Sequence, residues 1–107
     1  MRALAKATRE TLPPARAAET FEFEFEGTRF VATFSRYADG RLAELFLHAR
    51  KSDCLFDHLA SDTAKLVSFA LQHGARFDDL SRAMTRDANG HAQGLAGHVL
   101  DLIGDGR

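Results

Sequence analysis

Residues 21–26 read FEFEFE, and they are followed by Gly27-Thr28 and by RFVATFSRY at 29–37. Strict alternation of phenylalanine and glutamate is typical of a β-strand, because successive side chains point to opposite faces of a sheet. The pair Gly27-Thr28 predicts a two-residue hairpin turn. Residues 38–40 (ADG) predict a second turn, and a third strand follows at about 41–48. The short connections predict a three-stranded antiparallel meander.

The hydrophobic period becomes helical after the third strand. Residues from about Asp53 to His73 predict a long helix, with Ser52 or Asp53 as its N-cap. Two shorter helices are predicted at about 76–84 and 94–103. We therefore expect an α+β domain in which two or three helices pack on one face of the meander.

The long predicted helix carries a broad apolar stripe that begins at Leu55 and ends at Leu71. We expect this stripe to cover the sheet, because an apolar helix face in a small domain normally lies against the core. Truncating a core residue such as Leu66 to alanine would then cost about 2–5 kcal/mol. The predicted core comprises Phe23, Phe30, Phe34, Leu45, Leu47, Leu59, Leu66, Ala70, Leu80 and Leu102.

The third predicted strand also carries apolar side chains on its other face. Leu42 and Phe46 alternate with Leu45 and Leu47, so they should point away from the helices. An exposed patch of this kind usually marks a partner surface, and the simplest partner is a second copy in a twofold homodimer. The alternative is a monomer in which the chain itself shields Phe46.

Length and composition place this chain in one class and exclude others. A chain of 107 residues with 45% hydrophobic and 27% charged residues is one globular domain. We expect a basic N-terminal arm at 1–18 and a single α+β domain at 19–107. The formal net charge of -1 gives no field for nucleic acid, and no apolar run approaches the roughly 18 residues of a membrane span. The single cysteine fits a reducing compartment, so we expect the cytoplasm.

Two pairs of side chains are candidates for a reactive or metal-binding site. Cys54 and His58 lie four residues apart at a helix start and share a face, as a reactive thiol pair or half of a metal site would. A small buried thiol beside a surface histidine is the better explanation, because nothing in the sequence visibly orients the imidazole. His91 and His98 would share a helix face only if the last helix began before His91. We assign no catalytic, metal-binding or cofactor-binding residue.

Three arginines are candidates for contact with a ligand or a partner. Arg36, Arg41 and Arg86 lie at strand ends and in a loop, where a guanidinium could bind a phosphate or a partner's carboxylates. Solvated surface charge is the alternative explanation. Together with Phe46 they form the predicted ligand or partner surface.

Five segments occur in a characteristic order: DGRLAELFL at 39–47, SFALQHGA at 68–75, FDDL at 77–80, TRDANG at 85–90 and VLDLI at 99–103. They resemble the segments D-G-x-L-G-E-I-F-I, S-L-G-L-Q-Y-G-V, L-E-E-F, T-R-F-E-P-x-G and I-L-D-Y-I of the TSCPD domain. This domain is the C-terminal region of adenosylcobalamin-dependent (class II) ribonucleotide reductases. The motif that names the domain is absent here, so no catalytic residue is carried over.

The resemblance implies a stand-alone, non-catalytic accessory or regulatory domain that acts through protein or nucleotide contacts. Its partner would be a separate ribonucleotide reductase polypeptide. We expect no cofactor of its own and no activity in isolation. The alternative is a small thiol-reactive enzyme or metal-binding domain that uses Cys54 and His58.

Overall fold

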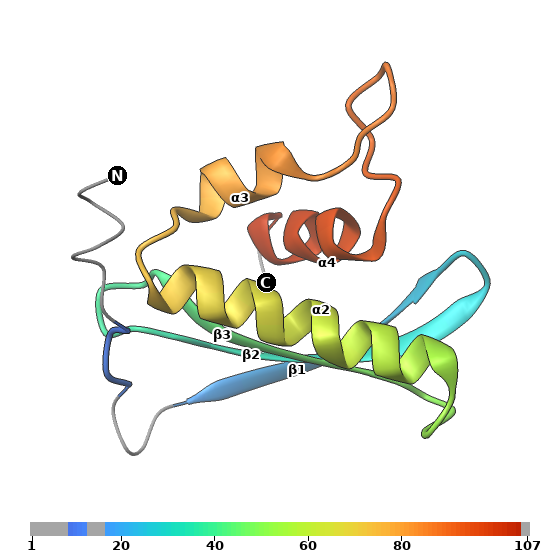
Figure 1. Ribbon diagram of the computed structural model, residues 1–107, viewed down its shortest axis with the longest axis horizontal. Coiled ribbons are helices and arrows are strands. Elements are labelled where there is room, and N and C mark those ends of the chain that lie inside the picture. Colours follow the sequence, from blue (N-terminus) through green and yellow to red (C-terminus); the bar gives the residue numbers. More distant parts are fainter. Residues whose placement is uncertain (1–8, 13–16, 106–107) are drawn as a thin grey trace.

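The structure, a computed structural model, describes residues 9–12 and 17–105, so most of the predicted N-terminal arm lies outside the described residues. It has an antiparallel sheet in the order β1-β2-β3 followed by three described helices, which confirms the predicted α+β fold (Figure 1). The elements are β1 (Ala18–Phe25), β2 (Thr28–Arg36), β3 (Leu42–Ala49), α2 (Leu55–Gln72), α3 (Phe77–Ala83) and α4 (Leu95–Gly104).

The first hairpin turn lies one residue earlier than predicted. Phe25 pairs with Thr28, so the turn residues are Glu26 and Gly27 rather than Gly27 and Thr28. Both turn residues have positive φ, 51° and 78°. Two positive φ angles are typical of a type I′ turn, whose twist matches that of the flanking strands. The two-residue hairpin was therefore predicted correctly, and its position was wrong by one residue.

The pairing of β2 with β3 explains why the second sheet face is less apolar than predicted. Phe34 pairs with Leu45, but the register shifts between Ser35 and Arg36, and Arg36 then pairs with Leu42. Strict alternation ends at this irregularity. Leu42 is consequently buried, with only 3% of its surface exposed, and the predicted patch of Leu42 with Phe46 does not form. Of the two residues of this predicted patch, only Phe46 is exposed, at 48%.

The core lies between the inner face of the sheet and the helices, which Figure 1 shows on one side of it. The five predicted sheet residues of the core are all buried. Helix α4 adds Val99, Leu100 and Ile103, which are also buried. The predicted core residues Leu80 and Leu102 are only partly buried and lie at the margin of the core. The confirmed sheet residues are Phe23, Phe30, Phe34, Leu45 and Leu47.

Helices α4 and α2 divide the sheet between them. The His98 ring of α4 packs against Phe25 and Phe23 of β1, with ring centroids 4.9 and 5.7 Å apart. Helix α2 lies instead along β3, the strand at the other edge. None of the helices in residues 9–12 and 17–105 has the length and apolar content needed to cross a bilayer.

Candidate functional site

Helix α2 turns a column of small and polar residues toward β3. Ala60, Ala64, Ser68 and Gln72 follow one another at intervals of four, which places them on one face of the helix. All four are buried, with exposed fractions between 0% and 8%. Side chains this short let the helix backbone lie close to the edge of the strand.

Polar side chains in this column hydrogen-bond the outer edge of β3. The Ser68 hydroxyl accepts a hydrogen bond from the Leu45 N–H at 2.8 Å and donates one to the Leu45 carbonyl at 3.0 Å. The Gln72 side-chain amide donates to the Ala43 carbonyl at 3.1 Å. An uncovered edge strand is a template for aggregation, and these bonds satisfy backbone groups that would otherwise be unpaired.

Asp57 secures the other end of the same helix. Its carboxylate accepts hydrogen bonds from the backbone N–H groups of Asp53 and Ala49, each at 3.0 Å. These two bonds hold the pKa of Asp57 below its usual value. The predicted cap was wrong, because the N-cap residue is Cys54, which makes no side-chain capping bond. Asp57 therefore anchors α2 to β3.

The opposite face of α2 carries large apolar side chains that point to solvent, which contradicts the predicted core. Leu59 and Leu66, both expected in the core, are 52% and 73% exposed. Most large apolar side chains of the predicted stripe therefore face outward, because the helix turns its small residues to the strand edge, whereas Val67 and Leu71 of the stripe are buried in the core. The exposed side chains are Leu55, Phe56, Leu59, Leu66 and Phe69.

Four of these side chains, together with Asp62, form a line that we call the outer seam. Leu55, Leu59, Asp62, Leu66 and Phe69 follow at spacings of four, three, four and three. This is the spacing by which one helix packs against another in a coiled coil. Among the described residues, Asp62 has no ion-pair or hydrogen-bond partner for its side chain. The outer seam is thus apolar with one unpaired carboxylate at its middle.

A cavity of about 440 Å³ opens beside the N-terminal half of the outer seam. Its walls come from α2, from the β1–β2 hairpin and from the start of α4, and they are mostly apolar. A cavity of this kind beside exposed Phe56 and Leu59 would accept one apolar side chain of a partner. It is lined by Phe25, Glu26, Thr28, Phe30, Phe56, Leu59, Thr63 and Leu95.

Two of the three predicted surface arginines are engaged near the β2–β3 turn. Arg41 pairs with Asp39 at 2.7 Å and with both carboxylate oxygens of Glu10, at 3.2 and 3.0 Å. Arg36 donates to the Gly40 carbonyl at 3.0 Å, and its guanidinium lies over the Phe34 ring. Both guanidinium groups are therefore held by contacts within the chain and lie apart from the outer seam.

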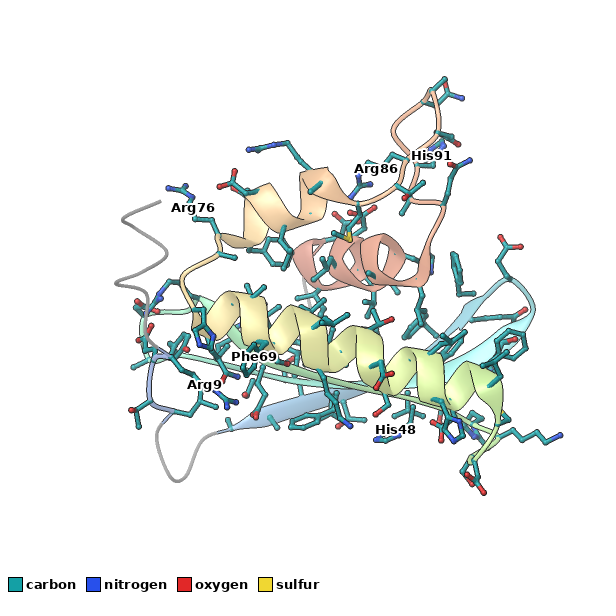
Figure 2. All side chains as sticks on the ribbon, in the orientation of Figure 1. Arg9, His48, Phe69, Arg76, Arg86 and His91 are labelled. Carbon is teal, nitrogen blue, oxygen red and sulfur yellow. The ribbon has the colours of Figure 1, made fainter. Side chains whose placement is uncertain are left out.

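The third predicted arginine, Arg86, joins α3 to α4. Its two terminal nitrogens each donate to one oxygen of Asp101 at 2.9 Å, and one also donates to the Ser81 carbonyl at 2.9 Å. Arg86 is mostly buried, with a side chain 21% exposed. The pair raises the pKa of Arg86 and lowers that of Asp101. The geometry is that of a structural clamp, and Figure 2 shows Arg86 beside α4.

Neither candidate pair, Cys54 with His58 or His91 with His98, forms a site within the described residues. The Cys54 thiol donates to the Lys51 carbonyl at 3.2 Å, whereas His58 contacts the Asp53 carboxylate at 3.2 Å. His91 lies outside α4, which begins at Leu95, so it does not share a helix face with His98. Within residues 9–12 and 17–105, no group of three or more potential ligands is placed to hold a metal ion.

Comparisons with protein-family models, with curated proteins and with solved structures found no match. The resemblance to the TSCPD domain therefore stays a prediction from the sequence. The site that the geometry singles out is the outer seam with its adjacent cavity. A sequence signal for it existed: the column Ala60, Ala64 and Ser68, whose four-residue spacing marks the face that makes the closest approach.

Proposed function

We propose that this protein is a non-catalytic accessory domain that binds another protein through the outer seam of α2. The observation that carries the proposal is the exposure of five large apolar side chains on one helix, each more than half exposed. Contiguous apolar surface of this kind is uncommon on monomeric proteins and usually marks a protein interface. Truncating an exposed leucine would change the free energy of unfolding little, so binding is the better explanation for this face.

The occupant that fits the outer seam is an amphipathic helix of the partner. The seam is straight, has coiled-coil spacing and extends along a helix of 18 residues, about 27 Å. A basic residue on the partner helix would pair with Asp62. A second copy fits less well, because an antiparallel pair centred on the seam would bring the two Asp62 carboxylates together.

The resemblance to the TSCPD domain makes a ribonucleotide reductase polypeptide the first partner to test. The single cysteine favours a reducing compartment, and we place the protein in the cytoplasm. The protein would then act as a regulatory or structural subunit beside an enzyme that performs the chemistry. Cys54 and His58 receive no role in this proposal.

Binding to the purified reductase polypeptide from the same source tests the proposal, by isothermal titration calorimetry with matched variants. We expect Leu66→Glu to weaken binding at least tenfold, because it places a charge in the middle of an apolar interface. Phe46→Glu makes the same chemical change on the other face of the sheet and should leave the affinity unchanged. Loss of binding in both variants, or in neither, would contradict the outer seam as the interface.

Sedimentation equilibrium of the protein alone tests the competing occupant. We expect one species near 11.8 kDa. A dimer that Leu66→Glu dissociates would assign the outer seam to a second copy, whereas a dimer that Phe46→Glu dissociates would assign the interface to the sheet. Nucleotide reduction by the protein alone, with adenosylcobalamin and a thiol reductant, would contradict the non-catalytic role.

A further inference from the structure

A second concave site lies on the other flank of α2, between that helix and the outer edge of β3. The groove has a volume of about 380 Å³, which is within the usual range for small-molecule sites. Phe46 of β3 and Phe69 of α2 both line it. Figure 2 shows Arg9, Phe69 and His48 along this side of the helix. The groove is distinct from the cavity beside Phe56.

The floor of the groove holds backbone groups that α2 leaves unbonded. The outward N–H and C=O of Leu45 are bonded by Ser68, and the outward carbonyl of Ala43 is bonded by Gln72. Strand alternation gives Leu47, two residues further, the same outward orientation. No described side chain hydrogen-bonds the backbone of Leu47, which lines the groove together with Ser61 and Ala64. Leu47 is only 1% exposed, so this donor and acceptor lie buried beneath the floor of the groove.

The charged groups that line the groove favour an anion. Lys65 makes no ion pair within the described residues. Arg9 hydrogen-bonds the neutral amide oxygen of Gln72 and lies over the Phe69 ring, 5.3 Å from its centroid. The opposing charge is Glu44, which also lines the groove and accepts a hydrogen bond from Ser35 at 3.3 Å. The two cations Arg9 and Lys65 therefore outnumber the carboxylate of Glu44 in the groove, and neither is ion-paired within the described residues.

We propose that the groove binds a small aromatic oxyanion, with its ring against Phe46 and Phe69 and its carboxylate or phosphate near Lys65. The ring would supply the apolar contact that both phenylalanines lack, since they are 48% and 56% exposed. The groove shares Phe69 with the outer seam, so the inference is tested on the protein without a protein partner.

Chemical-shift titrations of the full-length ¹⁵N-labelled protein test this inference with three probes of similar size. Indole-3-acetate and 1-naphthyl phosphate carry the two kinds of oxyanion, and indole-3-acetamide is the neutral control. We expect the acetate to bind about two- to fivefold more tightly than the acetamide, as an exposed ion pair would allow. The largest shifts should fall on the Leu47 amide and on residues 61–69. The phosphate shows which oxyanion the groove prefers.

Matched lysine variants complete the experiment. Lys65→Gln should lower the affinity for indole-3-acetate to that for the acetamide, whereas Lys51→Gln, at an exposed lysine outside the groove, should not. Equal affinity for the acetate and the acetamide would overturn the inference. So would an unchanged affinity in Lys65→Gln, or shifts confined to Leu55, Leu59 and Leu66 on the outer seam.

Discussion

The two faces of α2 differ in a way that reverses the usual expectation. The buried face carries the column Ala60, Ala64, Ser68 and Gln72 against β3, between 0% and 8% exposed, flanked by the buried Val67 and Leu71. The face toward solvent carries leucine and phenylalanine, with Leu66 73% exposed. An ordinary amphipathic helix has the larger apolar residues inside.

The difference follows from what each face contacts. The inner face meets a strand edge whose backbone polar groups need partners, so close approach and hydrogen bonding matter more there than apolar volume. The outer face has no such demand within the chain. Its leucines and phenylalanines add little to the stability of the isolated domain, and this is what a surface selected for a partner would show.

The largest expected effect comes from breaking the apolar part of the inner face. Leu71 is 5% exposed and packs in the core, so Leu71→Ala should lower the free energy of unfolding by about 2–5 kcal/mol. Urea denaturation followed by circular dichroism measures this loss. The control is Leu55→Ala at the exposed end of the same helix, and an equal loss in both variants would contradict the assignment of the faces.

A smaller effect should follow from removing the hydroxyl that bonds β3. Ser68→Ala leaves the buried N–H and carbonyl of Leu45 without partners, which should cost about 1–3 kcal/mol. Amide hydrogen exchange at Leu45 should also become faster. Ser61→Ala is the matched control, because Ser61 lies on the same helix with no hydrogen bond to β3 within the described residues. Unchanged exchange at Leu45 would argue against the edge bonds.

Acid should weaken the Asp57 anchor selectively. Backbone N–H groups of Asp53 and Ala49 lower the pKa of Asp57 in the folded state. A lowered carboxylate pKa contributes stability that is present above the unfolded value of about 3.9 and is lost as pH falls through the folded pKa. The stability difference between the natural protein and Asp57→Asn should therefore shrink below about pH 4. A difference that stays constant down to about pH 2 would contradict this role.

Sequence patterns predicted the strands well and the orientation of the long helix poorly. Alternation of Phe21, Phe23 and Phe25 with glutamates depends only on local geometry, so the strand was found to within a few residues. The burial of Leu42 depends on a register shift with β2 that the sequence does not show. The faces of α2 depend on what the helix meets, and a strand edge selects small residues. Periodicity alone assigns Leu59 and Leu66 to the core, and only the column Ala60, Ala64 and Ser68 marks the face that packs on β3.

The same reasoning explains why the ion pair of Arg86 was not predicted from the sequence. The sequence places Arg86 in a loop, but the fold brings the Asp101 carboxylate of α4 to 2.9 Å from the Arg86 guanidinium. Fifteen positions separate the two residues along the chain, and no local pattern joins them. Long-range ion pairs of this kind are visible only in the folded structure.

The smallest expected effect gives the most direct test of the central claim that the outer seam lies outside the core. Leu66→Ala removes a side chain that is 73% exposed, and alanine is at least as good a helix former. Urea denaturation at micromolar concentration should place the variant within about 0.5 kcal/mol of the natural protein. A loss of about 2 kcal/mol or more, independent of protein concentration, would place Leu66 in the core and contradict the account.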